Sequence, residues 1–125
     1  MLAGLKAPTE EDFYQIIISE GLEKAIQIYD EMRAKYPSET IIQEKVLNRI
    51  GSEAEWNNHP KVAGAVLLLN VHAYPNSAAA YENLAEADEA AGDKPEAVAN
   101  YKKALALDPA NSDAISGLKK LQPVN

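Results

Sequence analysis

Residues 78–109, AAAYENLAEADEAAGDKPEAVANYKKALALDP, contain the pattern that decides the fold. Small and apolar residues recur along this stretch with helical spacing, and a Gly-Asp step interrupts them once. Gly92 can adopt the left-handed conformation that follows a helix, while Asp93 and Glu96 have the spacing of a capping box with aspartate in place of serine or threonine. Pro109 lacks the N–H that another helical turn would need. The stretch therefore predicts two antiparallel helices, over residues 77–91 and 94–107.

The same punctuation recurs twice more along the chain. Prolines at positions 37, 75 and 109 are separated by 38 and 34 residues. An alanine stands 12 residues before each of them, at Ala25, Ala63 and Ala97. A large side chain stands eight residues before each, at Tyr29, Leu67 and Tyr101. Three units at a nearly fixed period indicate a helical repeat, in which neighbouring units bury one another's apolar faces.

These spacings resemble the tetratricopeptide repeat, a pair of antiparallel helices. In the third unit the matching residues are Tyr81, Leu84, Ala85, Gly92, Ala97, Tyr101, Ala104 and Pro109, while Asp88 stands where the pattern has tyrosine. The second unit matches at Leu47, Ile50, Gly51, Ala54, Ala63, Leu67 and Pro75, and the first at Gly21, Ala25, Tyr29 and Pro37. The resemblance implies an all-α fold with three tetratricopeptide helix pairs and a C-terminal capping helix in a short right-handed superhelix. It implies one domain over residues 1–125, with repeats at about 6–37, 42–75 and 78–109 and the cap at about 112–121.

The other helices are expected from caps and apolar periodicity. They cover residues 10–19, 22–35, 39–57, 60–73 and 112–121. Thr9 and Asp12 have the spacing of an N-terminal cap, and Pro60 suits the first turn of its helix. The four extra residues of the 38-residue interval match about one helical turn. We therefore assign them to the start of the helix over 39–57, with Ser38 as its N-cap.

Part of the chain resembles a more specific group of proteins. The segments EGLEKAIQIYDEMRAKYP, VLNRIG, the stretch from AVLLLNVHAYP through ALALDP, and AISGLKKL are similar to the tetratricopeptide tail of some bacterial serine hydrolases of the β-lactamase-like or α/β-hydrolase type. The similarity covers residues 11–121, with Ser52 and Asp88 where that family tends to have tyrosine. It implies a C-terminal docking or dimerisation tail and brings no catalytic residues, because those belong to another domain.

Composition excludes several classes of protein. The 125 residues carry 12 Lys+Arg against 19 Asp+Glu, a net charge of −7, and the isoelectric point near 4.8 argues against nucleic-acid binding. The absence of cysteine excludes disulfides, cysteine-bound zinc and a cysteine nucleophile. No apolar run approaches the ~20 residues of a membrane-spanning helix, and MLAGLKAPTEEDF lacks the apolar region of a signal peptide. We expect a soluble protein, cytoplasmic by default, with the compartment left open.

The candidate catalytic groups are few. Ser116 and Lys119 have the Ser-x-x-Lys spacing of penicillin-binding hydrolases, without the accompanying motifs. His59 and His72 are the only histidines. The acidic groups EED at 10–12 and EADE at 86–89 are explained by helix dipoles or solvent-facing surfaces. We predict no enzymatic activity, no cofactor and no metal site.

The resemblance places a peptide-binding groove along the first helix of each pair. Its positions correspond to Tyr14, Ile17, Ile18, Lys45, Asn48, Ser52, Glu55, Trp56, Ala79, Glu82, Glu86 and Glu89. Residues 78–109 hold seven acids and three bases, whereas residues 44–75 hold three of each. Such a groove favours a protein or peptide with aliphatic and basic side chains, and Glu82 and Glu86 would repel an acidic C-terminus.

Two alternatives stay open for this face. Trp56 and Ile17 could instead pack within or between the helices, although with Ile18 they could form one apolar patch on the groove wall. The face could also dock a catalytic domain of a parent chain or a second copy of this one.

Overall fold

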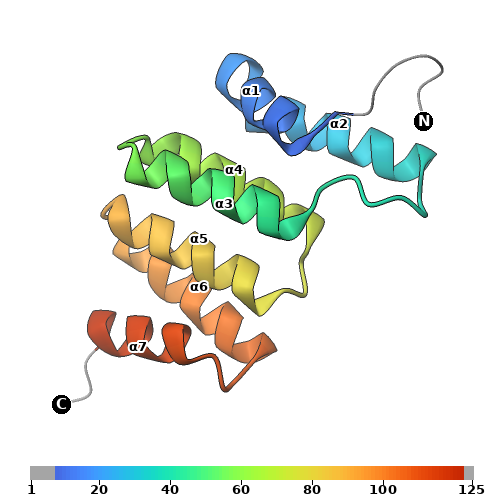
Figure 1. Cartoon of the computed structure of the whole chain (residues 1–125). Coiled ribbons are helices and arrows are strands. Elements are labelled where there is room, and N and C mark those ends of the chain that lie inside the picture. The colour runs from blue at the N-terminus through green and yellow to red at the C-terminus, as the bar shows by residue number, and fades with distance from the viewer. Residues whose placement is uncertain (1–7, 123–125) are drawn as a thin grey trace.

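The computed structural model describes residues 8–122, and every regular element among them is an α-helix. The seven helices are α1 (Glu10–Glu20), α2 (Leu22–Lys35), α3 (Glu44–Trp56), α4 (Pro60–Ala73), α5 (Ala78–Ala90), α6 (Lys94–Leu107) and α7 (Ser112–Leu121). Figure 1 shows them stacked in chain order as three antiparallel pairs, with α7 covering the last pair. The predicted all-α class, three helix pairs followed by a cap, is confirmed.

The helices begin and end where local chemistry favours it. The Thr9 hydroxyl accepts from the Asp12 N–H at 3.1 Å, and the Asp12 carboxylate accepts from the Thr9 N–H at 2.8 Å, which completes the expected capping box. Pro60 occupies the first turn of α4, where a missing N–H costs nothing. Gly92, after α5, has φ +80°, and the Asp93 side chain caps α6.

The four extra residues between the first two pairs do not extend a helix, so the expected helix over 39–57 was wrong at its start. Residues 36–43 form an irregular loop, and Gln43 rather than Ser38 is the N-cap of α3. Ile42 in this loop is 1% exposed, and its carbonyl accepts a hydrogen bond from the Tyr74 hydroxyl. The Gln43 N–H donates to Glu10 at 2.6 Å. Burial of the Ile42 side chain and these two hydrogen bonds therefore fix the conformation of the loop.

Small residues let the helices approach closely, as the repeat pattern predicts. Ala25, Ala63 and Ala97 are all fully buried. A Cβ atom added at Gly51 would lie 2.7 Å from Leu67 Cδ2, so α3 and α4 could not pack as they do with a larger residue there.

Larger apolar side chains fill the spaces between the helices. The N-terminal core cluster consists of Phe13, Ile17, Ala25, Tyr29, Ile42, Leu47, Ile50, Val66 and Leu69. A second cluster joins α5, α6 and α7 through Ala85, Ala97, Tyr101, Ala104 and Ala114. Asp88, which replaces the tyrosine of the repeat pattern, accepts a hydrogen bond from Asn100 at 2.7 Å and so links α5 to α6.

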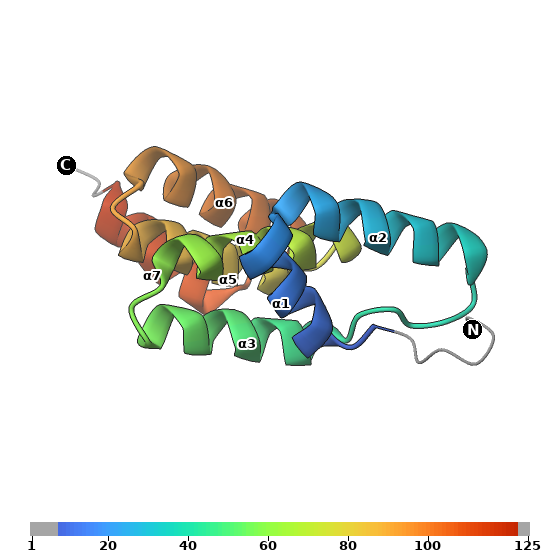
Figure 2. The ribbon, with the colours of Figure 1, turned by 90° about the horizontal axis from the view of Figure 1, so that it is seen from above.

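The stacking gives the molecule two different sides. In Figure 2, seen from above, α2 and α6 lie along one side of the stack and α3 along the other. Helix α3 contacts α1 and α5, and α5 contacts α7, so these four helices form a continuous inner face. The candidate groove residues all come from α1, α3 and α5.

Candidate functional site

Two depressions mark the inner face towards the C-terminal end of the stack. The larger, of about 520 Å³, lies between α5 and α7, and the smaller, of about 440 Å³, lies between α3 and α5. Both are bordered by Glu55, Glu86 and Ala90, so they form one groove. The larger is further lined by Glu89, Tyr101, Asp113, Ser116, Gly117 and Lys120, and the smaller by Ser52, Trp56, Asn58 and Pro60.

The groove is strongly acidic. Four carboxylates line it, from α3, α5 and α7, and Lys120 is the only Lys or Arg that borders it within residues 8–122. Lys120 forms an ion pair with Glu89, whose other oxygen accepts a hydrogen bond from the Tyr101 hydroxyl at 2.9 Å. These two donors, Lys120 above all, lower the pKa of Glu89. The one cation is therefore engaged, which leaves Glu55, Glu86 and Asp113 without a basic partner among the lining residues.

Glu82 lies beneath this surface and is 8% exposed. Burial, a hydrogen bond with Glu86, and the negative charges of Glu86 and Asp113 raise the pKa of Glu82 to about 8. Glu82 therefore keeps its proton to a higher pH than an ordinary carboxyl group does.

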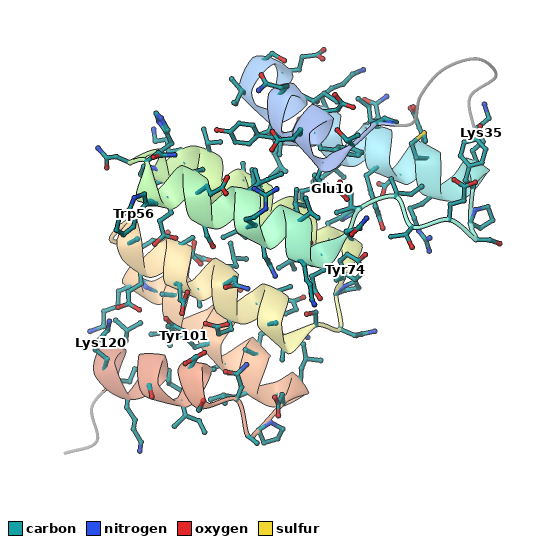
Figure 3. All side chains as sticks on the ribbon, viewed as in Figure 1. Glu10, Lys35, Trp56, Tyr74, Tyr101 and Lys120 are labelled. Atoms are coloured by element: carbon teal, nitrogen blue, oxygen red, sulfur yellow. The ribbon has the colours of Figure 1, made fainter. Side chains whose placement is uncertain are left out.

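The wall of the smaller depression combines charge with an exposed aromatic ring. Burial and, to a lesser degree, the charge of Glu86 raise the pKa of Glu55. The next residue, Trp56, is 90% exposed. Figure 3 shows Trp56 at the same end of the molecule as Lys120. Of the two alternatives left open for Trp56, the structure has the one in which the side chain lies on the surface and not between the helices.

The structure brings five of the sequence-derived groove residues to the two depressions: Ser52, Glu55, Trp56, Glu86 and Glu89. Lys45, Asn48 and Ala79 lie on α3 and α5 but do not border either depression. The Asn48 side-chain oxygen accepts from the buried Asn70 at 2.7 Å.

The assignment of Ile17 to the groove was wrong. Ile17 is 7% exposed and belongs to the N-terminal core cluster, while Tyr14 is half-buried against that cluster. Ile18 is 52% exposed. The apolar patch expected from Ile17, Ile18 and Trp56 is therefore not formed, because its central member faces inward.

Sequence reasoning missed the contribution of α7. We expected this helix only as a cap, yet it supplies Asp113, Ser116, Gly117 and Lys120 to the groove. A Cβ atom added at Gly117 would lie 2.3 Å from Cζ of Tyr101, so α7 rests directly on that ring. The signal was present, since a glycine inside an otherwise amphipathic helix often marks a close approach.

The remaining candidates for chemistry are not assembled into a site. Residues 8–122 contain no group of three or more His, Asp or Glu side chains arranged to hold a metal ion. Ser116 lines the groove without Lys119, and His72 Nε2 lies 2.7 Å from the Asp30 carboxylate, where it links α4 to α2. None of the described helices has the length and apolarity to cross a membrane.

Comparison with known proteins places the fold. No protein-family model and no curated protein matches the chain. Among solved structures it is similar to the first tetratricopeptide domain of Spaghetti (RPAP3) bound to the HSP90 peptide SRMEEVD. That likeness has a TM-score of 0.59 at 21% identity, over 90% of this chain and 86% of the other. It shows that the chain has a fold of the tetratricopeptide type.

Proposed function

We propose that this chain is a non-enzymatic protein-interaction module whose inner face binds a segment of another protein carrying basic and aliphatic side chains. The observation that carries the proposal is the groove itself, with four carboxylates, one engaged lysine and an exposed tryptophan. The exposed tryptophan supports the proposal, because tryptophan is enriched among the residues that dominate binding energy at protein interfaces. Charge of one sign in a groove selects partners of the other sign and speeds their association.

The structural neighbour supports a peptide as ligand but suggests a different charge. The peptide in that complex, SRMEEVD, carries three acidic residues and one arginine. Here Glu55, Glu86 and Asp113 would face such a peptide with like charge. Like-charge contacts suppress a partner, so this groove is expected to prefer the opposite charge.

Two matched peptides test the proposal. We expect SRMKKVK, in which lysine replaces each acidic residue of SRMEEVD, to bind the chain in isothermal titration at low salt, and SRMEEVD to bind at least about tenfold more weakly. Raising the salt from about 20 mM to 300 mM should weaken SRMKKVK binding, because exposed charge pairs are screened.

A variant locates the binding. Asp113→Lys should lower the affinity for SRMKKVK, whereas Glu53→Lys should leave it nearly unchanged, since Glu53 pairs with Arg49 on α3 and does not line the groove. Equal affinity for both peptides, or equal loss in both variants, would contradict a charge-selective groove.

The resemblance to hydrolase tails gives this face a second candidate role, as a docking or dimerisation tail that contacts a catalytic domain or a second copy. The same exposed Trp56 supports that role. Light scattering of the isolated chain tests the self-association form of this role. A dimer that Trp56→Ala converts to a monomer favours self-association, and a monomer at all concentrations opposes it.

A further inference from the structure

Trp56 ends α3 with its side chain in solvent. It is 90% exposed, whereas the other large apolar side chains that are exposed within residues 8–122, Ile18, Leu68 and Leu107, are 36–52% exposed. Folding therefore gains almost nothing from this indole. Tryptophan is also the side chain whose face attracts cations most strongly, and no cation of the described chain lies over it.

Two carboxylates lie in the same depression as the indole. Glu55 comes from α3, beside Trp56, and Glu86 comes from α5. They are close enough for the charge of Glu86 to raise the pKa of Glu55. Ser52, Asn58, Pro60 and Ala90 complete the lining, so no basic side chain neutralises this pair of acids locally.

A guanidinium group fits this combination better than other side chains do. It is planar, stacks on aromatic faces, and presents a fork of N–H donors that matches carboxylates. An ammonium group offers a compact, strongly hydrated charge and does not stack in this way. The depression has about 440 Å³, within the range of sites that take small ligands. Pro60 and Ala90 offer apolar surface for the methylene stem of an arginine.

We propose that the depression between Trp56, Glu55 and Glu86 is an arginine subsite, which takes the guanidinium group of a partner protein with the indole on one side and the two carboxylates on the other. The inference rests on the proposed function in that the arginine belongs to a segment lying on the inner face. It goes further by naming one side chain of the partner and the three groups that select it.

Small probes test the subsite apart from the peptide. We expect N-acetyl-arginine amide to shift the indole signal of Trp56 and the amide signals of Ser52 and Ala90 saturably in NMR titrations. N-acetyl-citrulline amide has nearly the same shape without the charge and should bind at least about tenfold more weakly, and N-acetyl-lysine amide should bind several-fold more weakly than the arginine probe.

Variants and their controls assign the roles. Trp56→Ala, Glu55→Gln and Glu86→Gln should each weaken binding of the arginine probe about three- to tenfold, followed through the amide signals of Ser52 and Ala90. Leu68→Ala removes another exposed apolar side chain, and Glu53→Gln removes a neighbouring acid outside the groove. Both controls should bind like the original chain.

The outcomes separate this inference from the proposed function. The subsite is wrong, and the module stands, if SRMKKVK binds the inner face but the arginine and citrulline probes bind with equal affinity. The same holds if SRMKKVK binds but Trp56→Ala leaves the affinity for the arginine probe unchanged. If the arginine probe binds as described while SRMKKVK does not, the subsite stands and peptide binding fails. A dimer in which the indole contacts a second copy would overturn the subsite.

Discussion

Ala63 and Ala97 each sit at a helix crossing with no exposed surface. Leucine at either position would have to displace neighbouring helices, and overpacking of this kind costs about 1–3 kcal/mol. We expect Ala63→Leu and Ala97→Leu to lower the denaturant midpoint of unfolding. Ala99→Leu, at an exposed position of α6, is the matched control and should shift the midpoint little. Unchanged midpoints for both buried variants would contradict the repeat register.

Glu82 gives stability a pH dependence of known sign. Its pKa is about 8 in the folded chain against an ordinary value of 4.5, so the folded state binds the proton more tightly than the unfolded state. The resulting stabilisation is fully present below pH 4.5 and is lost as the pH rises towards 8. Glu82→Gln keeps a hydrogen-bond donor for Glu86 but cannot ionise.

We therefore expect Glu82→Gln to match the original chain near pH 5 and to exceed its stability by about 2–4 kcal/mol at pH 9. Urea unfolding at several pH values measures the difference. Glu53→Gln, an exposed acid on α3, should show no such divergence. Two curves that stay parallel from pH 5 to pH 9 would mean that Glu82 is not held as a neutral acid.

At the scale of an element, the close packing of α7 against Tyr101 depends on Gly117. Replacing glycine by alanine inside a helix usually stabilises a protein by about 0.5–1 kcal/mol. At Gly117 the new methyl group would lie 2.3 Å from the ring of Tyr101, which is 2% exposed and tied to Glu89 through its hydroxyl. The ring cannot easily move aside.

Two substitutions with opposite expected signs follow from this contact. Gly117→Ala should destabilise the chain by about 1–3 kcal/mol. Gly64→Ala, in α4 with nothing within 4 Å of the added atom, should stabilise it. Thermal or denaturant unfolding of both variants measures the signs. Stabilisation by Gly117→Ala would show that α7 does not rest on Tyr101 and that its groove residues are misplaced.

The loop before α3 marks a limit of sequence analysis for such elements. Four residues equal about one helical turn, so the extra length of the first interval fits a longer helix as well as a loop. The periodicity of apolar residues could not distinguish a longer helix from a loop, because an apolar residue such as Ile42 is compatible with both. Tertiary contacts decide it, since that side chain enters the core and Tyr74 holds its carbonyl.

At the scale of the whole molecule, the fold was readable because its determinants are local and recur. Gly92, the prolines and the buried alanines each act within a few residues or at one crossing, and they repeat along the chain. The groove was harder, because it depends on which face each helix presents. Ile17 was misassigned where the repeat pattern is most degenerate, and the exposure of Trp56 is set by how α3 packs and could not be read from spacing.

The acidic groove is also a property of the whole stack, since α3, α5 and α7 each contribute carboxylates to it. Residue counts predicted its sign, with an excess of four acids over residues 78–109. They could not show that burial raises the pKa of Glu82 or that α7 adds Asp113 and Lys120, because both follow from tertiary packing.

The central claim is that the inner face, at its C-terminal end, binds a basic segment. The most direct measurement is an NMR titration of the isotope-labelled chain with SRMKKVK, read at every amide. We predict that the largest saturable shifts fall at Ser52, Glu55, Trp56, Ala90 and Gly117, with little change along α2, α4 and the outer surface of α6. Shifts centred on α2, α4 or α6, or no saturable shift at any amide, would contradict the account.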